Sequence, residues 1–341
     1  RMNATTMNRF VKHAQWTTHE PKQFGKVAVL MGGISAERDV SLKSGIAVLQ
    51  GLIAEGVDAH GLDLSPASLA QLDKSFDRAF VVLHGRWGED GAVQGLLDSL
   101  QIPYTGSNVL GCALAMDKVR SKQVWQAIGL PTADFRVVTE SKQLIHVAND
   151  LGLPLFMKPA REGSSVGVGK VTEVAKLEET WAKTAAFGDD VIAEQFISGD
   201  ELTVAVLEGR ALPIIRMSTA NEFYDYEAKY ESNETIYECP ADLSEELTER
   251  VQDLAVRAFK SLGCSGWGRV DLMLDSDGQP LLLEVNTVPG MTDHSLVPMA
   301  AAQVGLSFSK LCVEILASTL VEKQDGTTQD KAVPDKEGID E

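Results

Sequence analysis

Residues 266–296, GWGRVDLMLDSDGQPLLLEVNTVPGMTDHSL, restrict the possible folds more than any other stretch of the sequence. Two apolar-rich runs flank Asp277 and Gly278, the pair that two-residue type I′ loops favour because both loop positions need a positive φ. This pattern predicts a β-hairpin. With Asp277 and Gly278 as the loop, counting back along both strands places Asp271 opposite Glu284.

One face of this hairpin carries an unusual set of polar side chains. In the same register Arg269 lies opposite Asn286, and these two share a face with Asp271 and Glu284 because side chains alternate along a strand. Two carboxylates directly opposite each other repel. Mg²⁺ removes this repulsion, since it takes carboxylate and amide oxygens as ligands and keeps positions for water and substrate phosphates. Asp271, Glu284 and Asn286 are therefore the predicted metal ligands; the alternative is a solvated edge face on which Arg269 neutralises the acids.

The other face of the hairpin is predicted to be an apolar layer that packs on helices. Its members are Val270, Leu272 and Leu274 opposite Val285, Leu283 and Leu281. The second strand runs into residues 286–291, NTVPGM, whose Pro-Gly pair can direct backbone N–H groups toward the polar face. This turn favours a site over a solvated edge.

Composition excludes several classes of function. The 341 residues, 44% of them hydrophobic and 23% charged, are enough for two or three globular domains. A net charge of −18 argues against a nucleic-acid surface, which needs a basic footprint. The four cysteines show no C-x-x-C pair, which is typical of reduced cytosolic thiols. Because no apolar run approaches the ~20 residues of a membrane span and residues 1–23 lack a signal-peptide core, we expect a cytoplasmic protein without a membrane partner.

Strands and helices alternate in the first part of the chain. The expected elements are strands over 26–31, 57–64 and 78–84, a helix over 34–52 and a helix ending at Leu100. This alternation predicts an α/β fold with a parallel, doubly wound sheet, whose ligands bind beyond the carboxyl ends of the strands. Glu37 and His84 follow two such ends; for His84 a structural imidazole is the alternative. The spacing G-x-G-x-x-G is absent after Gly32 and Gly33, which argues against a dinucleotide site.

The middle of the chain predicts an α+β unit with a loop for phosphate. A helix is expected over 107–129, with Asp117 and Lys118 inside it, and further elements over 135–138, 143–151, 155–159, 174–187 and 190–197. Lys158 ends an apolar strand, and residues 160–170, AREGSSVGVGK, follow. Small residues let backbone N–H groups approach an anion. The spacing is not that of a Walker A motif, and the alternative is a plain hairpin turn.

The last part predicts antiparallel strands, a lid and three helices. Strands are expected over 201–207 and 211–217, helices over 244–262, 297–304 and 308–320. Residues 218–240 form a polar loop with several aromatic side chains, and loops of this length are usually lids or disorder.

With these features in hand, the chain resembles the ATP-grasp superfamily and, within it, the D-alanine–D-alanine ligase family. The resemblance runs from residue 26 to about residue 320 and rests on seven segments in order: GGISAERDVSL, LHGRWGEDG, MDKVRSK, KPAREGSSVGV, FYDYEAKY, GWGRVDLMLD and LEVNTVPGMTDHSLVP. It implies a three-domain ATP-grasp fold and a reaction in peptidoglycan precursor synthesis, and thus in cell-wall and cell-shape maintenance. ATP would phosphorylate the carboxylate of one D-alanine, and the amine of a second would attack the acylphosphate. The family also implies a homodimer.

The resemblance assigns a role to each candidate residue. Those implied to bind ATP are Lys118, Lys158, Ser165, Glu194, Ile197 and Glu201. Those implied to act in catalysis are Glu37, Ser164, Tyr230, Arg269 and Gly290, and those implied to bind D-alanine are His84, Lys229 and Ser295. Asp271, Glu284 and Asn286 would hold two Mg²⁺ ions, with Mn²⁺ as a substitute.

Within these sets, the resemblance also implies what individual groups bind. Glu37 would take the ammonium of the first D-alanine, Ser295 the carboxylate of the second. Arg269 and the Gly290 N–H would form the oxyanion hole, while Ser164 and Tyr230 would link two loops over the site.

The expected domains are an N-terminal α/β substrate domain over 24–116, a central ATP-grasp domain over 117–198 and a C-terminal metal-binding domain over 199–320. A flexible extension over 1–23 and a disordered acidic tail over 321–341 would flank them. Two positions depart from the family: Gln195 stands where many relatives have Lys near the adenine, and Val288 replaces a small polar residue. The competing functions are another ATP-grasp ligase and an ATP-binding protein with a dead site. The dead protein would lack the metal acids or the phosphate lysines, and this chain has both.

Overall fold

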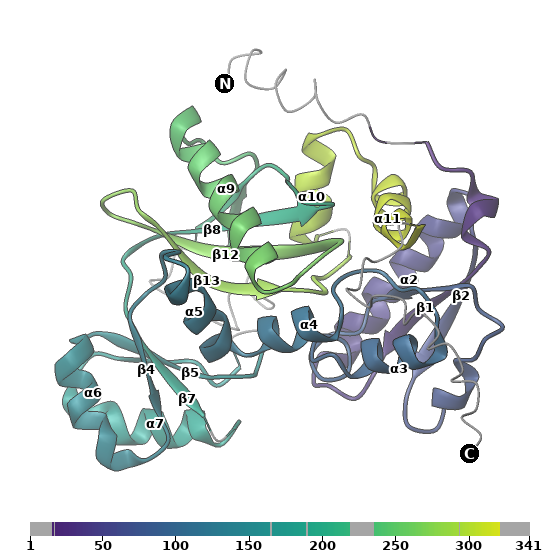
Figure 1. The fold of residues 1–341 in the computed structure, drawn as a ribbon. Helices are drawn as coiled ribbons and strands as arrows, with labels where there is room; N and C mark the ends of the chain where they lie inside the picture. Colours follow the sequence, from purple (N-terminus) through teal and green to yellow (C-terminus); the bar gives the residue numbers. More distant parts are fainter. Residues whose placement is uncertain are drawn as a thin grey trace, which may run out of the picture.

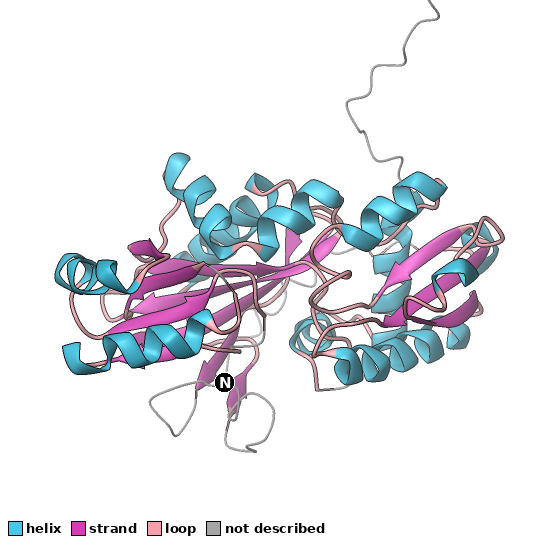
Figure 2. Cartoon of the chain, turned by 90° about the horizontal axis from the view of Figure 1, so that it is seen from below, coloured by secondary structure: helices cyan, strands magenta, loops and turns pink. Residues whose placement is uncertain are grey.

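The computed structural model describes residue 16 and residues 18–163, 166–188, 190–218, 235–292 and 294–320. These residues form three sheets with helices packed around them (Figures 1 and 2). Most of the expected extension, all of the expected acidic tail and residues 219–234 of the expected lid lie outside the described residues. The mixed α/β architecture confirms the predicted fold class.

The first sheet is parallel, as the alternating pattern predicted. Its order is β2 (Asp58–Leu64), β1 (Lys26–Gly32), β3 (Arg78–Val81). The central strand β1 is an apolar run that is buried after its first residue, as expected for a strand covered on both faces. Helices α2 (Arg38–Ala54) and α3 (Ala92–Leu100) flank the sheet (Figure 1). Glu37 therefore precedes α2, and His84 follows β3, at the carboxyl ends of neighbouring strands.

The second sheet is antiparallel, and its strands come from the middle of the sequence. Its order is β4 (Phe135–Val138), β7 (Val191–Gln195), β5 (Leu155–Pro159), β6 (Gly169–Val171). Helices α6 (Leu144–Leu151) and α7 (Leu177–Ala185) bury their apolar sides against it. Strand β5 carries Lys158 next to Ile192 of β7, one residue before the strand ends at Pro159.

The third sheet contains the predicted hairpin at its centre and edge. Its order is β11 (Ile236–Glu238), β10 (Ile215–Ser218), β8 (Gly199–Leu207), β12 (Trp267–Asp275), β13 (Pro280–Asn286), and β9 (Arg210–Ala211) pairs with β8. Helix α9 (Glu245–Ser261) covers its apolar face, and Ser244 caps this helix by accepting a hydrogen bond from the Leu247 N–H. The polar residues of β12 thus lie on the face away from α9.

The hairpin keeps the predicted pairing of the polar residues although the predicted loop is wrong. Asp275 and Gln279 close a three-residue loop, with the Asp275 N–H donating to the Gln279 carbonyl at 3.0 Å. Of the loop residues only Gly278 has a positive φ, at 73°, so the loop is not type I′. The Asp275 carboxylate accepts from the Asp277 and Gln279 N–H groups at 2.9 and 2.8 Å, which holds the wider turn.

A bulge in β13 then compensates for the extra loop residue. The register shifts between Asp271 and Leu272, so that Asp271 faces Glu284 while Leu272 faces Leu282. The predicted apolar pairs of Leu272 with Leu283 and of Leu274 with Leu281 are therefore wrong: Leu282 is buried instead, and Leu274 faces Pro280.

The single helix predicted over 107–129 is two helices, α4 (Val109–Met116) and α5 (Lys118–Ala127). Asp117 interrupts them with an extended backbone, φ −94° and ψ 102°, and its side chain accepts a hydrogen bond from the Arg120 N–H. Aspartate is a preferred N-cap because its carboxylate satisfies a free N–H of the first turn. The break makes Lys118 the first residue of α5.

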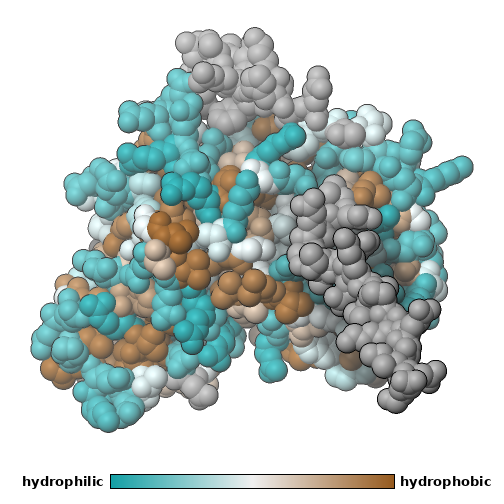
Figure 3. Space-filling view, in the orientation of Figure 1, coloured by the Kyte–Doolittle hydropathy of each residue, from teal (hydrophilic) through white to brown (hydrophobic). Residues whose placement is uncertain are grey.

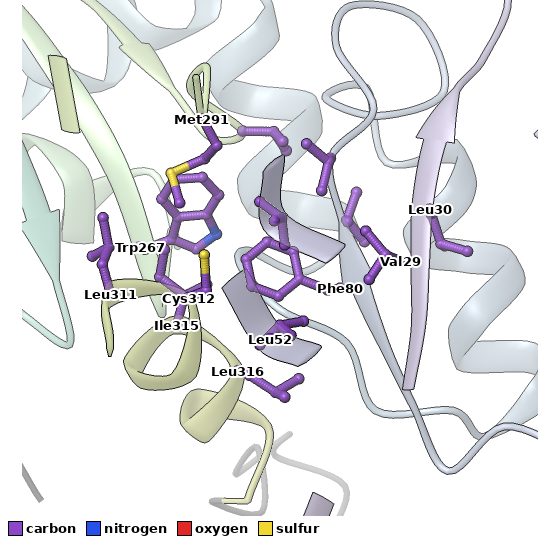
Figure 4. Packing of buried hydrophobic residues seen from close by; sticks show 14 of the residues in the cluster. Val29, Leu30, Leu52, Phe80, Trp267, Met291, Leu311, Cys312, Ile315 and Leu316 are labelled. Atoms are coloured by element: carbon purple, nitrogen blue, oxygen red, sulfur yellow. The ribbon is translucent and has the colours of Figure 1, made fainter. Parts of the chain in front are cut away.

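Helices α10 (Leu296–Gln303) and α11 (Phe308–Ala317) return the chain to the first sheet. Figure 4 shows α11 residues such as Ile315 beside Trp267 of β12 and Phe80 of β3, and the two rings have centroids 6.3 Å apart. The core around the parallel sheet thus includes helix α11. The predicted domain boundaries at 116/117 and 198/199 stay a prediction.

The surface is mixed in character. Figure 3 shows a mostly hydrophilic face with apolar side chains gathered near its middle, around the place of α4 and α5. The exposed apolar residues of α4 are Val109 and Leu110.

In the described part of the chain no single helix is long and apolar enough to cross a membrane. Only α10 and residues 308–320, taken together, reach that length and apolarity, and this pair is bent by 99°. The thiols of Cys112, Cys264 and Cys312 are buried, and that of Cys239 is partly buried.

Candidate active site

Loops from all three sheets meet over the polar face of β12 and β13. Lys118 of α5 lies 3.3 Å from Glu284 of β13, and His84 after β3 lies 2.8 Å from the Val288 carbonyl after β13. A Glu37 carboxylate oxygen is 3.4 Å from the place where a Cβ of Gly85 or Gly163 would stand. Residues predicted from distant parts of the sequence therefore lie at one site.

Part of the polar face of the hairpin is buried, which contradicts a solvated edge, but Arg269 does neutralise one of the acids as that alternative expected. Arg269 is 9% exposed and Asp271 is 3% exposed. The guanidinium of Arg269 donates from Nε and Nη2 to the two oxygens of Asp271, at 2.9 and 2.8 Å, and Thr203 Oγ1 donates to the same carboxylate at 2.6 Å. A buried carboxylate needs such partners, because burial without them is costly.

The three predicted metal ligands come together at the site. Asp271 faces Glu284 across the hairpin, and Arg269 faces Asn286. The Asn286 side-chain oxygen accepts the Val288 N–H at 3.2 Å. No three His, Cys, Asp or Glu side chains among the described residues form a metal-binding group, so a cation here would need the amide oxygen as well as the two acids. Carboxylate and amide oxygens are the donors that Mg²⁺ takes, so the set fits that ion.

Two lysines share one buried glutamate near this face, and a third lysine pairs with Glu284 instead. Lys158 Nζ lies 2.5 Å and Lys122 Nζ 2.9 Å from the carboxylate of Glu194. Burial would raise the pKa of Glu194, but the two ammonium groups outweigh it and lower that pKa to about 2. Burial likewise lowers the pKa of Lys122, whereas for Lys158 the Glu194 carboxylate outweighs burial and raises the pKa. The third lysine, Lys118, donates to the Glu162 carbonyl at 2.6 Å.

His84 is a neutral imidazole in a buried position. Its Nδ1–H donates to the Val288 carbonyl at 2.8 Å, and burial lowers its pKa. The other ring nitrogen, Nε2, is buried without a hydrogen-bond partner among the described residues. This nitrogen is therefore an acceptor available to a ligand.

Glu89 lies beside His84 and was not predicted. Its carboxylate accepts the Gly85 N–H at 2.7 Å. Burial, together with the nearby charge of Glu37, raises the pKa of Glu89 to about 8. The segment LHGRWGEDG contained this signal, because its first acid, Glu89, follows the same strand end as His84.

The turn after β13 places Gly290 beside Ser295. A Cβ at Gly290 would stand 3.1 Å from Ser295 Oγ, so a larger residue would press on that hydroxyl. Ser295 Oγ accepts the Thr292 N–H at 2.8 Å, and the Met291 N–H donates to Ser44 of α2 at 3.1 Å. The turn is thus held between the third sheet and the first.

Not every predicted site residue can be placed. Four of them, Ser164, Ser165, Lys229 and Tyr230, lie outside the described residues. Ile197 follows β7, and Glu201 in β8 is close enough to affect the pKa of Lys158. The sequence did not predict Lys122, which pairs with Glu194, or Thr203, which donates to Asp271. Lys122 could have been found, because it lies one helical turn after Lys118.

Comparisons with known proteins agree on one family. Residues 124–317 match the family model described as D-ala D-ala ligase C-terminus, and residues 58–107 match D-ala D-ala ligase N-terminus. A D-alanine–D-alanine ligase of Nitrosococcus oceani is 55% identical over 309 residues, 90% of this chain and 98% of that protein. One from Idiomarina loihiensis is 54% identical over 302 residues, 87% of this chain and 98% of that protein.

Solved structures show the same similarity. The crystal structure of D-alanine–D-alanine ligase from Bacillus anthracis matches with a TM-score of 0.79 and 39% identity, covering 86% of this chain and 97% of that one. The same enzyme complexed with ATP matches with a TM-score of 0.78 and 36% identity over the same shares.

Proposed function

The chain belongs to the D-alanine–D-alanine ligase family, and from this premise we propose how its residues carry out the ATP-dependent joining of two D-alanine molecules. In this reaction the carboxylate of one D-alanine takes the γ-phosphoryl group of ATP. The amine of the second then displaces phosphate, which gives D-alanyl-D-alanine, ADP and inorganic phosphate. The product is a precursor of peptidoglycan.

ATP is proposed to lie between the second and third sheets. Lys118 lies 3.3 Å from Glu284, and the charge of Glu284 also reaches Lys158; both lysines would bind the phosphates, together with Ser165. Glu194, Ile197 and Glu201 would surround the adenine and ribose, with Gln195 exposed at the end of β7. A protein contributes to phosphoryl transfer mainly by positioning the reacting groups and by neutralising their charge.

Asp271, Glu284 and Asn286 are the proposed ligands of two Mg²⁺ ions, which when bound neutralise the charge on the β- and γ-phosphates. In the structure Arg269 holds Asp271 and Lys118 holds Glu284. Each proposed acid ligand therefore already stands beside a cation. These two cations are placed to interact with negative charge on the substrates.

The first D-alanine is proposed to bind where the first sheet meets the turn 286–291. Glu37 would take its ammonium, and His84, which is near enough for the charge of Glu37 to act on it, would offer its unpartnered Nε2 as an acceptor. Arg269 and the Gly290 N–H would stabilise the oxyanion of the tetrahedral intermediate. Ser295 would bind the carboxylate of the second D-alanine, and Ser164, Lys229 and Tyr230 would close the site over both substrates.

The observation that carries this proposal is the meeting of Asp271, Glu284 and Asn286 with Lys118 and Lys158 around one covered face. A dead ATP-binding protein has no need of all five. Phosphate release from ATP, measured with and without D-alanine and with D-alanyl-D-alanine quantified alongside, tests it. Phosphate release that does not depend on D-alanine would favour another ATP-grasp activity.

Two further properties are proposed from the family. The protein would work in the cytoplasm, where ATP is available, and would form a homodimer through its N-terminal helices. Ile46 and Ile53 of α2 support the dimer, since they are 49% and 54% exposed on one helix. Light scattering of the purified chain and of Ile46→Glu tests it: a dimer that the charge dissociates is expected, and a monomeric parent chain would exclude it.

A further inference from the structure

Glu194 has two lysine partners, and only one of them is open to a ligand. Lys122 forms an ion pair with one carboxylate oxygen, at 2.9 Å but without hydrogen-bond geometry, and Lys158 donates a hydrogen bond to the other at 2.5 Å. The side chain of Lys122 is 0% exposed, whereas that of Lys158 is 17% exposed. Lys158 also feels the charges of Glu201 and Glu284, which lie toward the active site. A phosphate can therefore reach Lys158 but not Lys122.

Lys122 is fixed from its other side as well. Its Nζ donates to Thr132 Oγ1 at 2.6 Å, and the Thr132 hydroxyl donates in turn to the Leu282 carbonyl of β13 at 2.7 Å. The ring of Phe135 lies 5.7 Å from the ammonium. This chain of contacts joins the second sheet, through α5, to β13, which carries the proposed metal ligands Glu284 and Asn286. The ammonium of Lys122 thus has two partners inside the protein and no route to solvent.

The pairing creates a problem for the proposed role of Lys158. If Lys158 turned toward the phosphates of ATP, a glutamate with a single lysine partner would be left as an uncompensated buried charge, which is strongly unfavourable. Lys158 would then be held on Glu194 and lost to ATP. The second lysine removes this conflict, because Glu194 keeps one counter-ion whichever way Lys158 turns.

We propose that Lys122 is the resident counter-ion of Glu194 and thereby frees Lys158 to bind the phosphates of ATP. This inference rests on the proposed function, in which Lys158 contacts those phosphates. Lys122 is a positioning residue, since it acts through Glu194 and Lys158 and touches no substrate.

A double-mutant cycle tests the proposal through binding affinity. Dissociation constants of ATP and of adenosine, in the presence of Mg²⁺, are measured for the parent chain, Lys122→Met, Lys158→Met and the double variant. Lys122→Met is expected to weaken ATP binding roughly 10- to 100-fold, the range of one charge-assisted hydrogen bond, and to weaken binding of adenosine, whose adenine Glu194 is proposed to contact, by a smaller factor. In the Lys158→Met background it should lower the affinity for ATP no more than that for adenosine. Equal losses for ATP and adenosine, or equal losses in both backgrounds, would overturn the proposal in favour of a merely structural lysine.

A second pair of variants serves if Lys122→Met does not fold. In Glu194→Gln the carboxylate is neutral, so Lys158 needs no release, and adding Lys122→Met should leave the ratio of ATP to adenosine affinity unchanged. A further fall in that ratio would contradict the proposal. Lys183→Met is the matched control, because it removes a lysine 2.8 Å from Glu179 that is 75% exposed. Loss of ATP binding by the parent chain itself would instead reject the proposed function.

Discussion

Arg269 and Asp271 form a bidentate ion pair on one face of β12, with N–O distances of 2.9 and 2.8 Å. The two residues have different proposed roles: one stabilises an oxyanion and the other binds metal. In this proposal the residue that serves phosphoryl transfer, Asp271, is in direct contact with the residue that serves the attack of the amine, Arg269.

Arg269→Met is expected to slow dipeptide formation by about 10²–10³, the usual loss for one oxyanion donor. Steady-state rates of D-alanyl-D-alanine formation measure it. Arg269→Lys is the control. It keeps the charge but cannot form the two parallel hydrogen bonds to a carboxylate, so its rate should lie between those of the parent chain and Arg269→Met. Near-normal synthesis by the Met variant would remove Arg269 from the oxyanion hole.

Glu284→Ala is expected to abolish turnover while changing the free energy of unfolding by less than about 1 kcal/mol. The Lys118 pair that it breaks is partly exposed, such pairs stabilise little, and the substitution relieves repulsion with Asp271. Turnover at saturating Mg²⁺ and denaturant unfolding are the two measurements. Glu179→Ala removes an exposed glutamate from a surface pair and should keep full activity. If Glu284→Ala turned over like the parent chain, the metal-ligand assignment would fail.

Thr203→Val is expected to lower the free energy of unfolding by about 1–3 kcal/mol, because it leaves the buried Asp271 carboxylate without the hydroxyl that donates to it at 2.6 Å. Denaturant unfolding of the apo protein measures this loss. Thr172→Val, at an exposed position, is the control and should fall within about 0.5 kcal/mol of the parent chain. An equal effect of both substitutions would show that the hydroxyl adds nothing.

Glu89→Gln is expected to change the pH dependence of stability. The pKa of Glu89 is raised to about 8 in the folded protein from an ordinary value of 4.5, so the fold favours its protonated form. That contribution is fully present below pH 4.5 and is lost as the pH rises through 8. Relative to Glu89→Gln, the parent chain should therefore lose stability between pH 5 and 9. Unfolding in denaturant without Mg²⁺ at pH 5, 7 and 9 tests this, and a difference that stays constant would contradict the raised pKa.

The hairpin shows how far the sequence could predict this site. The pairing of Asp271 with Glu284 was predicted correctly, yet the loop has three residues and Leu283 is an extra residue in β13. The loop differs because the Asp275 carboxylate binds two backbone N–H groups of the turn, a side-chain effect that the Asp-Gly signal does not contain. The extra loop residue and the extra residue in β13 compensate for each other, so the polar residues keep the predicted pairing. The bulge lies next to the site, as bulges often do.

Long-range packing was the part that local patterns could not predict. The pattern over 107–129 is helical throughout, but Asp117 caps a new helix and so directs Lys118 toward Glu284. Lys122 looks like an ordinary helical lysine in the sequence; in the fold it contacts Glu194 of β7 and, through Thr132, the Leu282 carbonyl of β13. The return of α11 to the parallel sheet is likewise a tertiary contact, visible only once Ile315 and Phe80 share a core.

The central claim is that this site couples ATP cleavage to the joining of two D-alanine molecules. Incubating the purified chain with ATP and Mg²⁺, with and without D-alanine, and measuring inorganic phosphate and D-alanyl-D-alanine in the same samples tests that claim most directly. Phosphate release should depend on D-alanine and match the dipeptide one for one. Release without D-alanine, or D-alanine-dependent release without dipeptide, would contradict it.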